Sequence, residues 1–197
     1  MKQRHQNGFT LIELMITLLV AAIILGVGVP NFQEFISNNR MAAATNDVIS
    51  SLHLARSEAV KRRMNVTICP SANWESANAT CNAAGALADG FIVFADCSAA
   101  APCGAPNMAV DGFDALIRVH GPMPQGIVDL ITTDAAGPEY FSFSPTGFPR
   151  QAAGFAAPVS NLQLCDERGD QDTGGDTAAG RWMQITPTGR PQVYRDR

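Results

Sequence analysis

Residues 9–29 form an apolar stretch, FTLIELMITLLVAAIILGVGV, in which Glu13 is the single charged residue. About 20 apolar residues at roughly 1.5 Å rise each are needed for a helix to cross the hydrocarbon core of a bilayer. The stretch meets that length, so it predicts a membrane-spanning helix. A simple cytosolic enzyme is therefore excluded.

The residues on either side of this stretch predict its orientation. The first eight residues, MKQRHQNG, contain Lys2 and Arg4 and no acid, and positive charge on a flank favours the cytoplasmic side of the membrane. A cleavable secretory signal would end in a small-residue site of the Ala-x-Ala kind, whereas this apolar stretch is followed by Pro30 and Asn31. We therefore expect a single-pass protein with a cytoplasmic N-terminus.

Composition limits what the remainder of the chain does. The 197 residues are 46% hydrophobic and 16% charged, with a formal net charge of −4, which is too apolar for a disordered chain. The length predicts one domain or two small ones. The acidic average argues against a surface coated in positive charge for nucleic acid, although it leaves a local basic patch open.

A second helix is predicted after the apolar stretch, over residues 31–63, with a kink or loosening at Pro30. Glu58 and Arg62 are spaced for an i,i+4 ion pair, which we expect on the solvent side, and Leu54 falls off the apolar face. The residues that form this face at helical spacing are Val48, Leu52, Ala55 and Ala59, widened by Ile49 and Val60. Such a face requires a covering layer.

The covering layer is predicted to be β-structure. Seven short β-prone runs separated by turn residues lie at 65–69, 90–95, 115–119, 127–132, 139–143, 162–165 and 181–186. Because no helix separates them, antiparallel sheet is expected, with residues 91–94 central. The predicted fold class is α+β: a long N-terminal helix, membrane-spanning in its first half, packed on an antiparallel β-rich head.

The start of the apolar stretch resembles a known processing site. Residues 8–14, GFTLIEL, are similar to the motif of type IV pilins and the pseudopilins of type II secretion. The resemblance implies that a prepilin peptidase cuts after Gly8 and that Phe9 becomes the methylated N-terminus. The predicted segments are then a leader at 1–8, a transmembrane helix at 9–29, a stem helix at 30–63 and a head at 64–197.

Glu13 is the residue of this motif that requires a partner. A carboxylate within a bilayer segment costs about 2.5 kcal/mol or more and usually has a partner or a function. The resemblance implies that Glu13 neutralises the Phe9 amine of a neighbouring subunit during filament assembly. An acid tolerated near the interface is the alternative that the sequence leaves open.

Later features resemble the GspH/FimT group of minor pilins and pseudopilins. They are, in order, LARSEAVKR at 54–62, VTICPS at 66–71, GFIVFAD at 90–96, FSPTG at 143–147 and a terminal Gly189-Arg190. The resemblance implies a non-enzymatic subunit of a type IV pilus or a type II secretion pseudopilus. Its implied partners are the prepilin peptidase, other minor and major pilins or pseudopilins, and the inner-membrane assembly platform. It implies a bacterial inner-membrane location with a periplasmic head, and later a place in the filament.

The five cysteines favour disulfides over zinc. All follow the apolar stretch, in a compartment where disulfides form, and no Cys-x-x-Cys pair occurs among them. We predict the short-range bridges Cys69–Cys81 and Cys97–Cys103, with Cys165 as a buried thiol. A Cys69–Cys165 bridge is the main alternative.

No catalytic constellation, cofactor or metal site is predicted. Phosphate-binding, metalloprotease and nucleophile-elbow motifs are missing, and His53 and His120 have no evident catalytic partners. The acidic segment 166–176, DERGDQDTGGD, resembles a calcium loop only faintly, and a solvated loop is the better interpretation.

The C-terminal residues 189–197 give the alternative function. Arg190, Arg195 and Arg197 are candidate DNA-binding residues, since arginines neutralise phosphates and the intervening tyrosine stacks on bases. Family members linked to DNA uptake end in Gly-Arg-x-Arg, but this chain has Gln192 at the position of the second arginine. The competing interpretation is a solvated tail, or arginines that contact the next acidic subunit.

Overall fold

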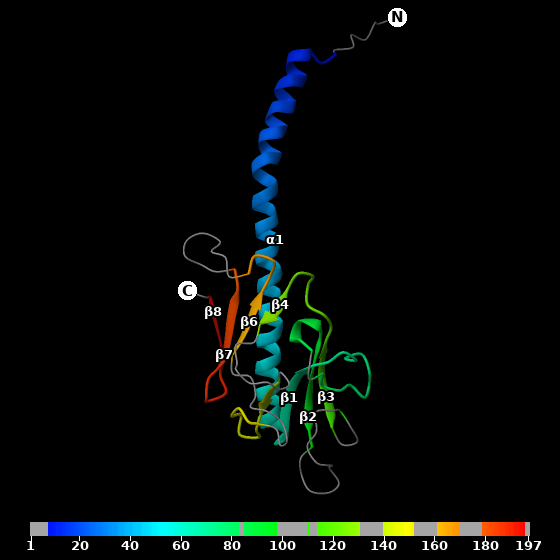
Figure 1. The fold of residues 1–197 in the computed structure, drawn as a ribbon, viewed down its shortest axis with the longest axis vertical. Coiled ribbons are helices and arrows are strands. Elements are labelled where there is room, and N and C mark those ends of the chain that lie inside the picture. Colours follow the sequence, from blue (N-terminus) through cyan, green and yellow to red (C-terminus); the bar gives the residue numbers. More distant parts are fainter. Residues whose placement is uncertain are drawn as a thin grey trace, which may run out of the picture. The chain divides into compact units, whose positions relative to one another are not determined.

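The computed structural model describes residues 8–82, 85–97, 110, 114–130, 140–151, 161–169 and 179–195, with backbone alone at 30, 128–130 and 195. The chain forms two compact units, Met1–Asn39 and Arg40–Arg197. Helix α1, Leu11–Arg62, is 52 residues long and contributes to both units. Figure 1 shows it as one long ribbon.

Helix α1 is not interrupted at Pro30, where the sequence predicted a kink or loosening. Proline lacks the N–H that would bond to the carbonyl of Gly26. One residue later, the Asn31 side chain donates through Nδ2 to the carbonyl of Val27 at 2.9 Å. The helical hydrogen bonds on either side keep the backbone helical through this position.

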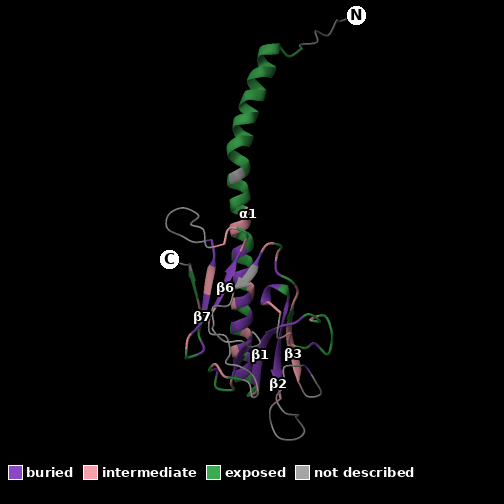
Figure 2. Ribbon diagram, in the orientation of Figure 1, coloured by how far each residue is buried: buried purple, intermediate pink, exposed green. Residues whose placement is uncertain are grey.

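The part of α1 in the first unit exposes its apolar side chains. Every described side chain from Leu11 to Phe35 is exposed, and the described residues of this part of the helix are green in Figure 2. By length and composition, α1 is the one helix in the described part of the chain that could cross a membrane.

The second unit contains two four-stranded antiparallel sheets. In the first sheet the strand order is β3-β2-β1-β5, and in the second it is β4-β6-β7-β8. The strands of the first sheet are β1 Asn65–Pro70, β2 Phe91–Asp96, β3 Ala115–His120 and β5 Phe141–Phe143. Those of the second are β4 Val128–Leu130, β6 Asn161–Cys165, β7 Arg181–Ile185 and β8 Pro191–Arg195, and a short 3-10 helix, Leu87–Asp89, precedes β2.

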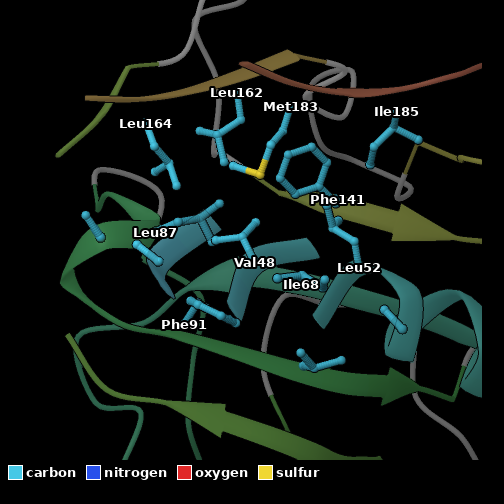
Figure 3. Packing of buried hydrophobic residues seen from close by; sticks show 14 of the residues in the cluster. Val48, Leu52, Ile68, Leu87, Phe91, Phe141, Leu162, Leu164, Met183 and Ile185 are labelled. Atoms are coloured by element: carbon cyan, nitrogen blue, oxygen red, sulfur yellow. The ribbon is translucent and has the colours of Figure 1, made fainter. Parts of the chain in front are cut away.

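The core of this unit forms where both sheets meet the second half of α1 (Figure 3). The helix contributes Val48 and Leu52, which are 2% and 1% exposed. The first sheet contributes Ile68, Phe91 and Phe141, and the second contributes Leu162, Leu164, Met183 and Ile185. The predicted cover for the helix is therefore present, and it is built from two sheets.

Strand β2 has the central place that its apolar sequence predicted. It lies between β1 and β3, and all of its side chains are buried. Phe91 and Val93 join the main core, whereas Ile92 and Phe94 join a second cluster with Tyr140. Both faces of the strand are thus covered, which explains why its sequence is a continuous apolar run.

Two residues of α1 are placed differently from the prediction. Glu58 is 9% exposed and lies within the buried stripe, rather than on the solvent side. It follows Ala55 by three residues, a spacing that keeps it on the same helix face. Val60 is 51% exposed and does not widen the stripe, because five residues after Ala55 the helix has turned it away from that face.

The C-terminal residues differ most from expectation. The sequence analysis treated these residues as a tail without strand structure, but β8 pairs along its length with β7, in the register from Arg181–Arg195 to Ile185–Pro191. The seven expected strands are all present, and β8 is an additional one. A tight turn ending at Gly189 brings β8 back along β7, and this turn is part of the site described below.

Candidate functional site

The first turn of α1 is closed by a reciprocal pair of hydrogen bonds between Thr10 and Glu13. The backbone N–H and the hydroxyl of Thr10 donate to Oε2 of Glu13, at 2.8 and 2.9 Å. The N–H of Glu13 donates back to the Thr10 hydroxyl at 3.3 Å. This is a capping box, in which a threonine and a glutamate three residues later satisfy the open N–H groups of a helix start.

The capping box gives Glu13 a role within its own helix. The Thr-x-x-Glu spacing was visible in the sequence, but the sequence analysis did not use it. The carboxylate is held at the positive end of the helix dipole, where negative charge is stabilised. Phe9, immediately before this turn, is 87% exposed. Gly8 precedes it, and residues 1–7 of the expected leader lie outside the described residues.

Two matching turns define a second site in the head. They span residues 144–148, SPTGF, and 186–190, TPTGR. In each, the N–H of the first residue donates to the carbonyl of the fifth, at 2.9 and 3.0 Å, and the glycine N–H donates to the carbonyl of the first residue at 2.8 Å. Gly147 and Gly189 have φ of +79° and +80°, which residues with a side chain rarely adopt.

Arg56 of α1 joins these two turns to the helix. Its Nε donates to the carbonyl of Gly147 at 3.0 Å, and its Nη2 donates to the carbonyl of Thr188 at 3.0 Å. The turns also touch each other, since a Cβ added to Gly189 would lie 2.2 Å from the carbonyl oxygen of Gly147. One guanidinium therefore fastens a hairpin of each sheet to α1.

Comparison with known families covers both sites. A family model described as "Type II transport protein GspH" matches residues 44–189, which include α1 from residue 44, the strands from β1 to β7, the first turn, and the second turn except Arg190. The chain belongs to the GspH family. A model of the prokaryotic N-terminal methylation motif matches residues 3–29. This GspH-family chain is thus a minor pilin or pseudopilin, a structural subunit of a pilus or pseudopilus.

Membership of the GspH family carries general consequences. Subunits of this class are anchored by their apolar N-terminal helix. They are processed by a prepilin peptidase and assemble with other pilins. The class consists of structural subunits rather than known enzymes.

Similar solved structures include two crystal forms of the type IV minor pilin FimU of Pseudomonas aeruginosa, each 18% identical in sequence. The first has a TM-score of 0.49 and covers 81% of this chain and 92% of that chain. The second has a TM-score of 0.45 and covers 78% of this chain and 91% of that chain. No curated protein matches the sequence significantly.

The disulfide predictions are partly confirmed in this GspH-family head. Cys69 and Cys81 form a bridge, with Cα atoms 5.4 Å apart, and Cys165 is a buried thiol. The alternative bridge between Cys69 and Cys165 is therefore wrong. Cys97 is disulfide-bonded, but its predicted partner, Cys103, lies outside the described residues.

The candidate DNA-binding arginines are only partly described. Arg190 is exposed at the end of the second turn, Arg195 is described by its backbone in β8, and Arg197 lies outside the described residues. DNA binding by these residues stays a prediction, and no observation favours it.

The two histidines considered in the sequence analysis lie apart, since His53 is exposed on α1 and His120 has packing contacts at the end of β3. The ring of His120 stacks on Phe91 with centroids 4.7 Å apart, and its Nε2 lies 3.3 Å from Oδ2 of Asp47. Within the described ranges, no group of three His, Cys, Asp or Glu side chains is placed to hold a metal. In segment 166–176, the weak calcium-loop candidate, Asp166 forms an ion pair with Arg168. Residues 170–176 lie outside the described residues.

Proposed function

We propose that this GspH-family chain is a single-pass protein of the bacterial inner membrane that is processed and then built into a filament. Residues 1–8 are the cytoplasmic leader, 9–29 the transmembrane helix, 30–63 the stem, and 64–197 the periplasmic head. The observation that carries the proposal is the exposed apolar surface of α1 from Leu11 to Phe35, which lies largely within the methylation motif. Such a surface requires lipid or neighbouring helices to cover it.

Processing is proposed to occur between Gly8 and Phe9, with methylation of the new Phe9 amine. A Cβ at Gly8 would have no atom within 4 Å, so packing within the chain does not require glycine there. A requirement for glycine at this position would then come from the peptidase. Removal of the leader also removes Lys2 and Arg4, which changes the net charge from −4 to −6.

Glu13 is proposed to change partners during assembly. In the single chain its carboxylate caps its own helix through Thr10. Processing creates a cationic amine at Phe9, and side-by-side packing brings the amine of a neighbouring subunit to this carboxylate. Because an unpaired charge in a low-dielectric environment is costly, the pair fixes the register between neighbouring helices.

The partners in this pathway are proposed to be the prepilin peptidase, the inner-membrane assembly platform, and other minor and major pilins or pseudopilins. Of the two machines, we favour the type IV pilus, because subunits exposed outside the cell benefit more from a bridge such as Cys69–Cys81. Deleting the gene should then abolish pilus assembly and leave protein secretion intact. Loss of secretion with normal pili would reverse this choice.

Two substitutions separate the charge of Glu13 from its capping role. Glu13→Gln keeps a side-chain oxygen that can cap the helix but removes the charge, and Thr10→Ala weakens the cap but keeps the charge. We expect Glu13→Gln, like Glu13→Val, to be processed normally and to be at least tenfold depleted from sheared filaments. Thr10→Ala should be incorporated normally. Normal incorporation of Glu13→Gln would overturn the pairing.

Gly8→Val tests the processing step separately. A side chain at the scissile glycine should block the peptidase, so that a precursor retaining its eight-residue leader accumulates in the membrane. Mass spectrometry of the purified chain would show this directly. A mature Phe9 N-terminus in this variant would show that cleavage does not depend on the glycine.

A further inference from the structure

Two polar side chains fasten strand β3, at the edge of the first sheet, to helix α1. Arg118 and His120 are two residues apart on this strand, so both side chains leave it on the same face. Arg118 donates through Nη1 to Oγ of Ser50 at 2.9 Å, and Nε2 of His120 lies 3.3 Å from Oδ2 of Asp47. Since Asp47 and Ser50 are about one helical turn apart, β3 is held at two points to one turn of α1.

Both ring nitrogens of His120 face oxygen atoms that only accept hydrogen bonds. Nδ1 lies 2.6 Å from the carbonyl oxygen of Gly121, and Nε2 faces the carboxylate of Asp47. A neutral imidazole has one N–H and one unprotonated nitrogen, so it can donate to only one of the two oxygens. The unprotonated nitrogen would then point its lone pair at the other oxygen, which is repulsive. A ring that is protonated on both nitrogens suits both neighbours.

The packing around the His120 ring holds it in this position. The ring stacks on Phe91, with centroids 4.7 Å apart and an angle of 3° between the two planes, and the His120 side chain is 18% exposed. Trp74 packs on the next residue, since a Cβ added to Gly121 would lie 3.4 Å from Cη2 of its indole. A cation over the face of an aromatic ring is attracted to it, so the stack on Phe91 also suits the protonated form.

The charged groups around the ring act in opposite directions. Asp47 of α1 favours a second proton on the ring, whereas the positive charge of Arg118, on β3 itself, opposes it. Three further charged side chains lie on the neighbouring elements, are exposed, and make no described contact with the ring: Arg40 on α1, Glu75 in the loop after β1, and Asp89 in the 3-10 helix before β2. Asp47 is therefore the charged group in direct contact with the ring.

We propose that His120, Asp47 and the Gly121 carbonyl form a proton-dependent clamp between the edge strand β3 and the stem helix. With both ring nitrogens protonated, β3 is held to α1 through His120 and through Arg118. When the ring loses one proton, one of its two contacts becomes repulsive, and the Arg118 contact remains. The edge of a sheet carries open backbone N–H and C=O groups, so the clamp sets how firmly this edge is held.

The direction of the pH effect follows from this geometry. The clamp binds the second proton in the folded chain, and the unfolded chain has no equivalent contact. By linkage, the clamp then stabilises the head at acid pH, and this contribution is lost as the pH rises. Histidine changes its charge between about pH 5 and pH 8, which is where the change in stability is expected.

A double-mutant cycle of Asp47→Asn and His120→Gln tests the clamp. The full chain in detergent micelles is unfolded by denaturant at about pH 5.5 and at about pH 8, on either side of the usual histidine range. Carboxylates are ordinarily ionised at both pH values, so the ring is the member of the pair that changes charge. The two substitutions should be coupled about two- to fivefold in the unfolding constant at pH 5.5, the range for partly exposed ion pairs. The coupling should fall toward one at pH 8.

His53→Gln is the matched control, because His53 is exposed on the same helix, and it should leave the pH dependence of stability unchanged. Amide hydrogen exchange places the effect within the head. At pH 5.5, Asp47→Asn should speed exchange in β3 at least twofold and leave β6, in the other sheet, unchanged.

Three results would overturn the clamp. They are a coupling that is equal at the two pH values or larger at pH 8, no coupling at either pH, and exchange that rises equally in β3 and β6. If His120→Gln does not fold, Asp47→Asn decides by itself. It should then destabilise the head more at pH 5.5 than at pH 8, and an equal loss at both pH values would overturn the clamp.

Discussion

The two halves of α1 are both helical, yet they bury their side chains in opposite ways. From Leu11 to Phe35 the helix is almost entirely apolar, and every described side chain is exposed. From Met41 to Ala59 it is less apolar, but residues at helical spacing are buried to 0–2% exposure. The first half has apolar residues all round, which suits lipid or neighbouring helices, and the second has a stripe, which suits one covering layer.

The polar residues of the two halves differ in the same way. Glu13 makes its described hydrogen bonds within the first turn of its own helix. Arg56 donates hydrogen bonds to Gly147 and Thr188, which follow it in the chain by 91 and 132 positions. The first half is therefore self-contained, while the second is held by the fold around it. The comparison predicts that substitutions in the second half change the stability of the head and that those in the first half do not.

Truncating a leucine in each half should give the largest contrast. Leu52→Ala should destabilise the head by about 2–5 kcal/mol, the usual cost of deleting a buried leucine side chain, since Leu52 is 1% exposed. Leu19→Ala, at a residue that is 61% exposed, should leave it unchanged. Both tryptophans lie in the head, so denaturant unfolding followed by their fluorescence measures this unit. Equal effects of the two substitutions would refute the comparison.

Removing the Cys69–Cys81 bridge tests how far the covering layer supports the second half of α1. The double variant Cys69→Ser and Cys81→Ser should lose about 3 kcal/mol, the chain-entropy value for a loop of this size. Unfolding of the head with and without reductant provides the measurement. If reductant destabilises the head of the double variant as much as that of the original chain, the stabilisation comes from the Cys97 bridge instead.

Adding one methyl group at the Arg56 contact should have an intermediate effect. Gly189→Ala places a Cβ 2.2 Å from the carbonyl of Gly147 at a φ of +80°, so backbone strain of about 1–2 kcal/mol is joined by a steric clash. Gly169→Ala is the matched control, because its φ is +60° and no atom lies within 4 Å. The first variant should unfold at clearly lower denaturant. Equal unfolding midpoints for the two variants would show that the turns accommodate the added methyl group without loss of stability.

The smallest expected effect concerns Glu58 and depends on pH. Hydrogen bonds from Arg62 and then Lys61 lower the pKa of Glu58. Its ionised form therefore stabilises the fold above the unfolded-state pKa of about 4.3, and this contribution is lost as pH falls through the lower folded-state value. Glu58→Gln should be less stable than the original chain at pH 7, and the difference should shrink as the pH falls below about 4.3.

Exposed Glu34, in the first half of the helix, supplies the control for this titration. Glu34→Gln should leave the unfolding midpoint of the head unchanged at pH 7 and at pH 3. A Glu58→Gln effect that stays constant between pH 7 and pH 3 would assign the loss to packing rather than to charge.

Local pattern was sufficient for much of this fold. The positions of seven strands, the central place of residues 91–94, the Cys69–Cys81 bridge and the buried Cys165 were all predicted. Each depends on neighbours close in sequence or on burial that follows from an apolar run. β8 was missed because its Pro-Gln-Val-Tyr-Arg sequence is polar at alternate positions and begins with proline, which is tolerated at a sheet edge.

The errors on the helix have a related cause. Helical spacing alone placed Val60 beside the stripe, but the sheets cover only one side of the helix, and Val60 lies outside the covered arc. Glu58 was assigned to the solvent side as the partner of Arg62 in an i,i+4 ion pair. The pair is present, and with Lys61 it supplies two cations within one turn, which makes burial of the carboxylate tolerable.

The anchoring helix with its processing motif, the apolar stripe of the stem and a β-rich head typical of the GspH family could all be recognised in the sequence. These features follow from composition, period and a contiguous motif, which are local properties of the chain. The folded structure was needed to show that two sheets, rather than one, cover the stem, and that Arg56 joins a turn from each of them. Those contacts link residues far apart along the chain, and their carbonyl acceptors are backbone groups that every residue possesses, so no side-chain pattern marks them in advance.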